Sequence, residues 1–350
     1  MAITAGTYTF GGGGADYASL VDALLDLGTL TGDLTLVQVG DSVDAFNIGV
    51  SISLAGNTLK IEQDAASPHN GSPIAPYTVT VGALGLNQAA GSRGGLWLKN
   101  LNIIASPADN GTGLNLGAMN GISIVSFYRM ESCLVYCTNV NATAVGSASP
   151  TGTGGGAGQF RMQLSACKFY GGKLAYAFST GSSTISNLIR VYLEAENNFF
   201  KVTRNGGTDK PVSLSFLVGS PATPIALFSW KNNVHWVADA AQPGMTIGDS
   251  GNNFYAPSLS GAQNARNPGS DSLSWAYDSI QTPDDIITTD SSLAGFGNTD
   301  PDSDLYTNGT APALAFNPFS TPPYLIGLTY PAAPPEDSES WYVPAFVAGF

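Results

Sequence analysis

The sequence predicts an all-β fold, a right-handed parallel β-helix with a short N-terminal capping helix and an irregular C-terminal region. Three observations predict it: one helical pattern near the N-terminus, many short apolar stretches between turn residues, and an internal repeat. A repeat of this length is typical of stacked structural units. The aligned apolar positions of the five repeats, spaced by 30 to 35 residues, are Leu101, Val135, Phe169, Phe199 and Val234.

Residues 1–33 are expected to form an N-terminal strand and the capping helix. Asp16 is placed to cap this helix and Gly28 to end it. The residues that would share its apolar face are Tyr17, Leu20, Val21, Leu24 and Leu25. Because the open end of a β-helix exposes strand edges and core, we expect the helix to cover that end.

Residues 34–256 are predicted to form the β-helix, with the five aligned positions in one continuous core. Asn at the turns tolerates the left-handed conformation that such corners need. A Rossmann-like fold would require helical patterns between strands, and none follows residue 28. A β-sandwich is the remaining alternative.

Residues 257–350 lose the repeat and become rich in Pro, Asp and Ser. The final segment, 331–350, is too short to form its own core, and its aromatic residues are typical interface anchors. We therefore expect it to pack against a neighbouring subunit or a particle shell, and a disordered end is the alternative. The predicted partner-binding residues are Trp341, Tyr342, Phe346 and Phe350.

The charge balance argues against several classes of partner. The chain has 26 acidic and 13 basic residues, a net charge of −13, whereas nucleic acids and anionic lipids need clustered Lys and Arg. No stretch of 18 or more apolar residues predicts membrane insertion, and Met1–Phe10 lacks an export signal. We expect no nucleic-acid partner and no insertion into a membrane.

Two segments resemble a known family. Tyr8-Thr-Phe-Gly-Gly-Gly-Gly-Ala-Asp-Tyr-Ala-Ser-Leu20 is similar to the start of pectate-lyase-like right-handed β-helix proteins, versions of which occur in bacteriophage structural proteins. Asp302-Ser-Asp-Leu-Tyr-Thr-Asn-Gly-Thr-Ala-Pro-Ala-Leu314 resembles the element that closes many of them, with Gly-Thr-Ala-Pro-Ala in place of the usual Gly-Ser-Pro-Ala. The resemblance spans about residues 8–314 and implies architecture more strongly than chemistry.

Glycoside hydrolysis needs two carboxylates, and Glu194 and Glu196 are candidates because they alternate with apolar residues on one predicted strand. Glu131 lies in a nearby repeat. The alternative is a solvated polar face with an Arg190–Glu194 pair, which we favour. The lyase activity of the family would require a calcium-binding Asp cluster beside basic residues, and no such pattern repeats.

Metal and phosphate motifs are weak. Asp300-Pro-Asp-Ser-Asp304 lacks the Gly and Glu of a calcium loop, and His69 and His235 have no Cys at zinc-ligand spacing. Gly152–Ala157 has no predicted strand before it and no predicted helix after it, as a dinucleotide-binding glycine motif would require. The geometry of the helix cap explains Gly11–Gly14 without a bound anion. We predict no metal, cofactor or catalytic residue.

Two further sets of side chains have structural and functional interpretations. Cys133 and Cys167 are expected in adjacent turns as stacked thiols, with a disulfide as the alternative. Trp97, Trp230 and Trp236 would line a sugar-binding groove or fill core and subunit contacts.

The expected function is structural: a non-enzymatic surface protein of a phage virion, a capsid decoration or spike component. We expect a homotrimer that contacts capsid or other virion proteins after assembly in the host cytoplasm. The alternative is a tailspike-like adhesin or depolymerase that binds a host surface glycan. Carboxylates at hydrolase distance in a groove would favour it.

Overall fold

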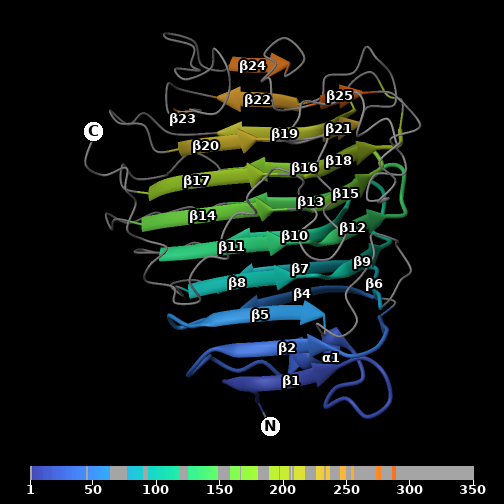
Figure 1. Ribbon diagram of the computed structural model, residues 1–350, viewed down its shortest axis with the longest axis vertical. Helices are drawn as coiled ribbons and strands as arrows, with labels where there is room; N and C mark the ends of the chain where they lie inside the picture. Colours follow the sequence, from blue (N-terminus) through green and yellow to red (C-terminus); the bar gives the residue numbers. More distant parts are fainter. Residues whose placement is uncertain are drawn as a thin grey trace, which may run out of the picture.

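The computed structural model shows a parallel β-solenoid, in which successive strands stack from the N-terminal end upward (Figure 1). The residues that the structure describes are 2–44, 46–63, 77–89, 94–118, 125–148, 158–165, 167–179, 189–196, 198–204, 206, 209–216, 226–231, 234–236, 245–249, 254–255, 273–276 and 286–288. Between residues 34 and 249, each turn places one strand in each of three sheets, which confirms the predicted parallel β-helix.

Sheet 1 has nine strands. In spatial order they are β1 (Gly6–Phe10), β2 (Leu34–Gln38), β5 (Thr58–Gln63), β8 (Gly94–Lys99), β11 (Val125–Glu131), β14 (Gly158–Ser165), β17 (Ile189–Glu196), β20 (Ala226–Lys231) and β23 (Phe254–Tyr255).

Sheet 2 has eight strands. They are β3 (Ser42–Val43), β6 (Val79–Val81), β9 (Asn102–Ala105), β12 (Leu134–Cys137), β15 (Lys168–Gly171), β18 (Phe199–Val202), β21 (Val234–Trp236) and β25 (Ile286–Thr288).

Sheet 3 also has eight strands. They are β4 (Asn47–Ile52), β7 (Ala83–Gln88), β10 (Thr112–Ala118), β13 (Thr143–Ala148), β16 (Leu174–Ser179), β19 (Lys210–Phe216), β22 (Met245–Asp249) and β24 (Leu273–Ala276). The pairing of β22 with β24 is antiparallel. Strands β24 and β25 fall inside the predicted C-terminal region, whose boundary stays a prediction.

The core forms because equivalent residues stack in columns along the solenoid. In sheet 1, Leu96 is in register with Leu59 in the turn before and with Tyr128 in the turn after. In sheet 2 the rings of Phe169 and Phe200 pack against each other, tilted by 32°, with centroids 5.3 Å apart. All five side chains are at most 2% exposed, so apolar burial is continuous from turn to turn.

The corner between sheets 1 and 2 has a constant length. From β8 to β21, two residues separate each sheet 1 strand from the following sheet 2 strand. The first of them is left-handed at Asn100 (φ 53°) and Ser132 (φ 50°), which confirms the turn role predicted for Asn. Backbone hydrogen bonds continue through this corner, since the N–H of Asn100 donates to the carbonyl of Glu131 at 2.9 Å.

The second corner residue points into the core. Cys133, Cys167 and Asn198 occupy this position in successive turns, and all are fully buried. The N–H of Cys167 donates to Oδ1 of Asn198 at 2.9 Å, and the N–H of Cys133 donates to Sγ of Cys167 at 3.5 Å. Both cysteines are free thiols in adjacent turns, as predicted, and burial raises the pKa of Cys167 well above its usual value.

The predicted repeat alignment is right at Val135 and Phe169 and wrong at its other three positions. Val135 is in register with Ile103 rather than with Leu101, which is a buried corner residue one position before β9. Phe169 is in register with Phe200 rather than with Phe199. Val234 is likewise one residue out of the column, which continues at His235. Corner residues and inward-facing strand residues can both be apolar, so the sequence pattern could not distinguish the two kinds of position.

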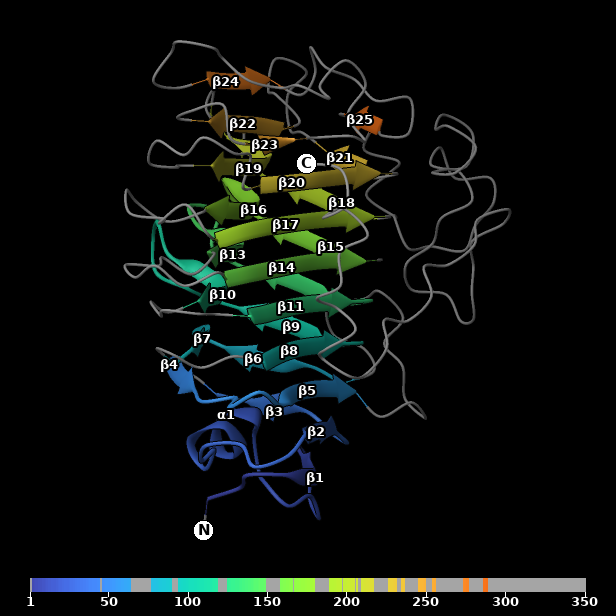
Figure 2. The same ribbon diagram turned by 90° about the vertical axis from the view of Figure 1, so that its left-hand side faces the viewer.

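Helix α1 (Leu20–Leu25) lies at the N-terminal end of the solenoid, beside β1 and β2 (Figure 2). Its N-cap is Ser19, whose Oγ accepts a hydrogen bond from the N–H of Asp22 at 3.1 Å. The prediction that Asp16 caps the helix is therefore wrong. Asp16 instead accepts hydrogen bonds from the N–H and Oγ1 of Thr9, at 2.8 and 3.0 Å, and these bonds lower its pKa.

The helix is also shorter than predicted. It ends at Leu25, which is 68% exposed rather than part of the apolar face, and the C-cap is Asp26 rather than Gly28. The preceding glycine run has a steric cause, because Gly11 is left-handed (φ 78°) and a Cβ there would overlap the carbonyl of Gly40. Whether α1 acts as a cap against end-to-end association stays a prediction.

We expect the Phe169→Asp variant to be severely destabilised, because it places an unpaired charge against Phe200 and Tyr176, whose ring centroids lie 5.3 and 6.0 Å from that of Phe169. The loss should exceed the ~3 to 5 kcal/mol typical of Phe→Ala in a core. Guanidinium unfolding followed by circular dichroism measures it. Phe169→Leu is the matched control and should lose much less. An unchanged midpoint in the Asp variant would contradict the register.

Candidate functional site

Two outer faces of the solenoid are candidates for function, and the first is the charged face of sheet 1. It consists of six side chains on β5, β8 and β11: Lys60, Glu62, Trp97, Lys99, Arg129 and Glu131. Strand pairing puts Lys60, Trp97 and Arg129 in one column and Glu62, Lys99 and Glu131 in the neighbouring one. Cations and carboxylates therefore alternate across the face.

Trp97 lies at the centre of this face. Its ring centroid is 4.6 Å from Nζ of Lys60, 4.9 Å from Cζ of Arg129 and 5.4 Å from Nζ of Lys99. A side chain at Gly95 would overlap the ring of Phe127, so this glycine makes room for a second aromatic residue on the same face. With 6% of its surface exposed, Trp97 offers little open ring for stacking on a sugar.

The carboxylates of this face are paired with its cations. Glu131 lies 2.7 Å from Nη2 of Arg129, and both side chains are almost completely buried. Glu62 lies 3.1 Å from Nζ of Lys60 in a more exposed pair. An acid catalyst has to be protonated and within reach of a leaving group. Glu131 is instead held in an ion pair with Arg129, which is a structural role.

The structure places Glu194 and Glu196 further along the same sheet. Leu193 and Ala195, the two neighbours of Glu194 on β17, are buried, which confirms the predicted alternation there. Pairing sets Glu194 beside Gln163 and Glu196 beside Ser165. Their side chains, and that of Arg190, lie outside what the structure describes, so their catalytic role stays untested.

Glu131 and Glu196 are in the same column, two strands apart. Strand spacing puts their Cα atoms roughly 10 Å from each other. Carboxyl pairs of inverting glycosidases are about 6.5 to 9.5 Å apart, which this backbone spacing slightly exceeds. Glu131 is ion-paired with Arg129, so it is not a free acid or base for such a pair.

The two remaining tryptophans of the sequence prediction lie in different columns, as judged from backbone pairing alone. Trp230 is in the inward column of Met130 and Leu164. Trp236 is in the outward column of Tyr136. His235 lies in β21, and its side chain is not described. His69, Gly152–Ala157, Asp300–Asp304, Trp341, Tyr342, Phe346 and Phe350 lie outside the described residues.

The described ranges contain no cluster of three or more His, Cys, Asp or Glu side chains suited to a metal ion. Nor do they contain a helix with the length and hydrophobicity of a membrane span.

The second candidate is the outer face of sheet 3, which sequence reasoning missed. We call it the small-residue face. Pairing aligns two outward columns, which are Gly49, Gly85, Asn115, Gly146, Ala177 and Ser213, and Ser51, Asn87, Gly117, Ala148, Ser179 and Ser215. The columns continue to Thr246 and Gly248 in β22. Every residue in them is neutral and small or an amide, and none of the twelve is buried.

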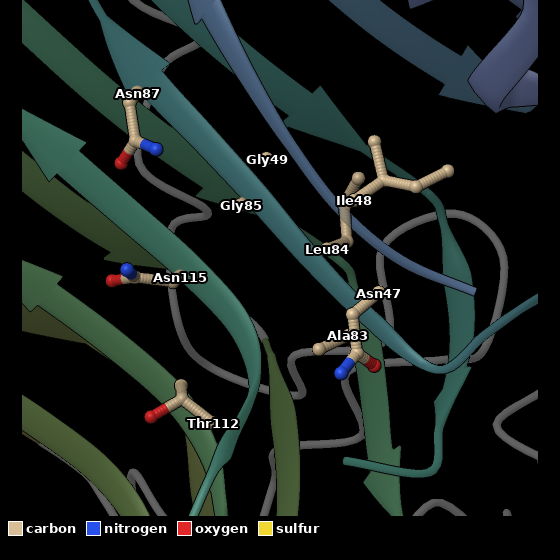
Figure 3. A pocket seen from close by; sticks show the side chains of 9 residues that line it. All are labelled: Asn47, Ile48, Gly49, Ala83, Leu84, Gly85, Asn87, Thr112 and Asn115. Carbon is tan, nitrogen blue, oxygen red and sulfur yellow. The ribbon is translucent and has the colours of Figure 1, made fainter.

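A shallow pocket of about 390 Å³ lies at the N-terminal end of the small-residue face (Figure 3). Asn47, Asn87, Asn115 and Thr112 supply its polar groups, and Gly49 and Gly85 leave the space between them. The amide of Asn87 lies over the glycines, since a Cβ at Gly85 would be 3.5 Å from its Nδ2. The pocket can donate and accept hydrogen bonds but carries no charge.

The sequence does contain a signal for this face. Strands β4, β7 and β10 read Asn-Ile-Gly-Val-Ser-Ile, Ala-Leu-Gly-Leu-Asn-Gln and Thr-Gly-Leu-Asn-Leu-Gly-Ala, in which large apolar residues alternate with small neutral ones. Aligning these segments as a third strand of the repeat would have revealed the columns.

We expect Arg129→Met to cost ~3 to 5 kcal/mol of stability, because it leaves the buried carboxylate of Glu131 without its partner. The double variant Arg129→Met/Glu131→Leu should recover most of that loss. Lys60→Met is the control at the more exposed pair and should cost at most about 1 kcal/mol. Urea midpoints compare the four proteins. A double variant as unstable as the single one would show that the ion pair does not govern this face.

Comparisons with protein-family models, with curated proteins and with solved structures find no match to this chain. The resemblance to pectate-lyase-like proteins is thus supported for the architecture, a parallel β-solenoid, and not for membership of a family.

Proposed function

We propose that this chain is a non-enzymatic structural protein of a bacteriophage virion surface, a capsid decoration or spike component. It works as a rigid β-helical module in a homotrimer and contacts capsid or other virion proteins. It reaches the particle surface after assembly in the host cytoplasm.

The non-enzymatic part of the proposal is supported by the ion pairs that hold the carboxylates of the charged face. Around Trp97, both carboxylates are held by cations, at 2.7 Å for Glu131 and 3.1 Å for Glu62. Neither carboxylate of this face is therefore free to act as an acid or a base. The phage location is supported by the similarity of the segment from Tyr8 to Leu20 to phage structural β-helices.

A tailspike-like adhesin or depolymerase is the second candidate. It is favoured by the position of Glu194 and Glu196 on the strand that continues the outer face bearing Trp97. Residues i and i+2 of a strand share a face with Cα atoms about 6.6 Å apart, within reach of carboxylate-pair geometry.

Mass spectrometry of purified virions of the encoding phage tests the virion proposal. Copy numbers comparable to the major capsid protein are expected for a decoration protein, and a few copies for a tail component. Absence of the chain from intact particles would overturn the proposal.

We expect purified protein to leave host capsule and lipopolysaccharide intact, because both carboxylates on the described part of the charged face are ion-paired. Chromatographic sizing of the glycans after incubation measures this, with Glu194→Gln and Glu196→Gln as matched variants. Glycan cleavage by the unmodified chain that either substitution abolishes would establish the depolymerase instead.

A further inference from the structure

Sheet 3 begins with an unpaired strand edge at the N-terminal end of the solenoid. Its first strand, β4, pairs only with β7 (Figure 2). In a parallel strand, the N–H and C=O of one residue point to the same side, and the side alternates from residue to residue. The carbonyl of Ile52 accepts a hydrogen bond from Ala89, which follows β7. The carbonyl of Ser53 accepts from Leu30, on the opposite side. Odd-numbered residues of β4 therefore face the open edge.

The open edge of β4 consists of the backbone groups of three residues, which are Asn47, Gly49 and Ser51. All three residues are exposed, and the exposure of Gly49 is that of the main chain, because it has no side chain. Their N–H and C=O groups form no hydrogen bond with any part of the chain that the structure describes. Unpaired groups of this kind are a template on which an extended chain adds as a further strand.

Apolar side chains beside the open edge are left partly uncovered. Helix α1 covers the far half of β4, since Leu24 and Val50 belong to one buried cluster. Ile48 is only partly buried, although Leu84, its counterpart in the next turn, is 1% exposed. Phe46, directly before β4, is 75% exposed. A strand added at the open edge would extend the column of Ile48 and remove this apolar surface from water.

The charge of this end determines which chain would fit. The first 59 residues contain six Asp and no Glu, Lys or Arg. The six are Asp16, Asp22, Asp26, Asp33, Asp41 and Asp44. Burial and the neighbouring charge of Asp22 raise the pKa of Asp44, so the carboxylates already repel one another. A second copy of this end would add to the repulsion, whereas a cationic partner would relieve it.

We propose that the open edge of β4 binds an extended, basic segment of another particle protein by strand addition. The backbone of the segment pairs with Gly49 and its two edge neighbours, and one apolar side chain of the segment lies over Ile48. The proposal rests on the proposed function, because it takes the partner from the virion. It adds the surface, the mode of binding and the chemistry of the partner.

Attachment of the full, labelled chain to particles of the encoding phage that lack it tests the proposal, with co-sedimentation as the measurement. Gly49→Pro removes one edge N–H, and an edge strand tolerates Pro where the N–H faces solvent. We expect attachment to weaken about tenfold or more, since a hydrogen bond is lost and the ring obstructs pairing. Gly49→Ala is the matched control. It keeps the N–H, and its Cβ has nothing nearer than Nδ2 of Asn87, at 4.0 Å.

Hydrogen exchange measured by mass spectrometry distinguishes strand addition from contact through side chains alone. Bound particles should protect the backbone amides of residues 47–51 from exchange. Circular dichroism melting establishes whether Gly49→Pro folds. If it does not, Phe46→Ser replaces it and should also weaken attachment. Val140→Ser, at a residue that is 57% exposed on another turn, is the control and should attach normally.

Equal attachment of folded Gly49→Pro and Gly49→Ala overturns the proposal, as does binding that leaves the amides of β4 unprotected. Either result leaves the virion function intact if the unmodified chain attaches. An unmodified chain that attaches to no particle overturns the proposal together with the contact to virion proteins. Sedimentation velocity gives the remaining outcome: self-association that Gly49→Pro abolishes would make the occupant a second copy and the proposed partner wrong.

Discussion

The whole structure depends on one constraint, the constant register between equivalent strands of successive turns. Because parallel strands pair residue for residue, a side chain in one turn lies over its counterparts in the turns before and after it. Tyr128 thus packs in the column of Leu96 and Met162, although about thirty residues separate each from the next. A column is apolar, charged or small as a unit, so each face acquires its character from several turns at once.

This constraint explains why the three outer faces differ so much in chemistry. On sheet 1, neighbouring columns carry complementary charges, and the cations lie over the ring of Trp97. On sheet 2, the outward Lys168 is only 1% exposed, and this burial lowers its pKa well below the usual value. On sheet 3, the two outward columns of the small-residue face contain neither charged nor large apolar side chains. A solenoid of uniform backbone thus displays three different surfaces.

The sequence was sufficient for the architecture and insufficient for its details. Repeat spacing and alternation predicted stacked parallel strands, and Val135 and Phe169 were placed in the correct column. Leu101 was misplaced because a buried corner residue is as apolar as a strand residue. Asp16 was misplaced because an Asp before a helical pattern can bind either a helix N-terminus or a neighbouring strand, and only the tertiary fold selects Thr9.

The small-residue face was missed because glycine and serine look like turn residues until their strands are aligned.

The two-residue corner between sheets 1 and 2 also has an evolutionary consequence. From β8 to β21 its length never changes, since one added residue would rotate the following strand and exchange its buried and exposed faces. The connections from sheet 3 back to sheet 1 are not constant: five residues separate β7 from β8, and nine separate β13 from β14 and β16 from β17. Insertions and deletions that survive selection should therefore accumulate at that edge. Related chains would then diverge in their loops along one ridge of the solenoid while its frame is inherited unchanged.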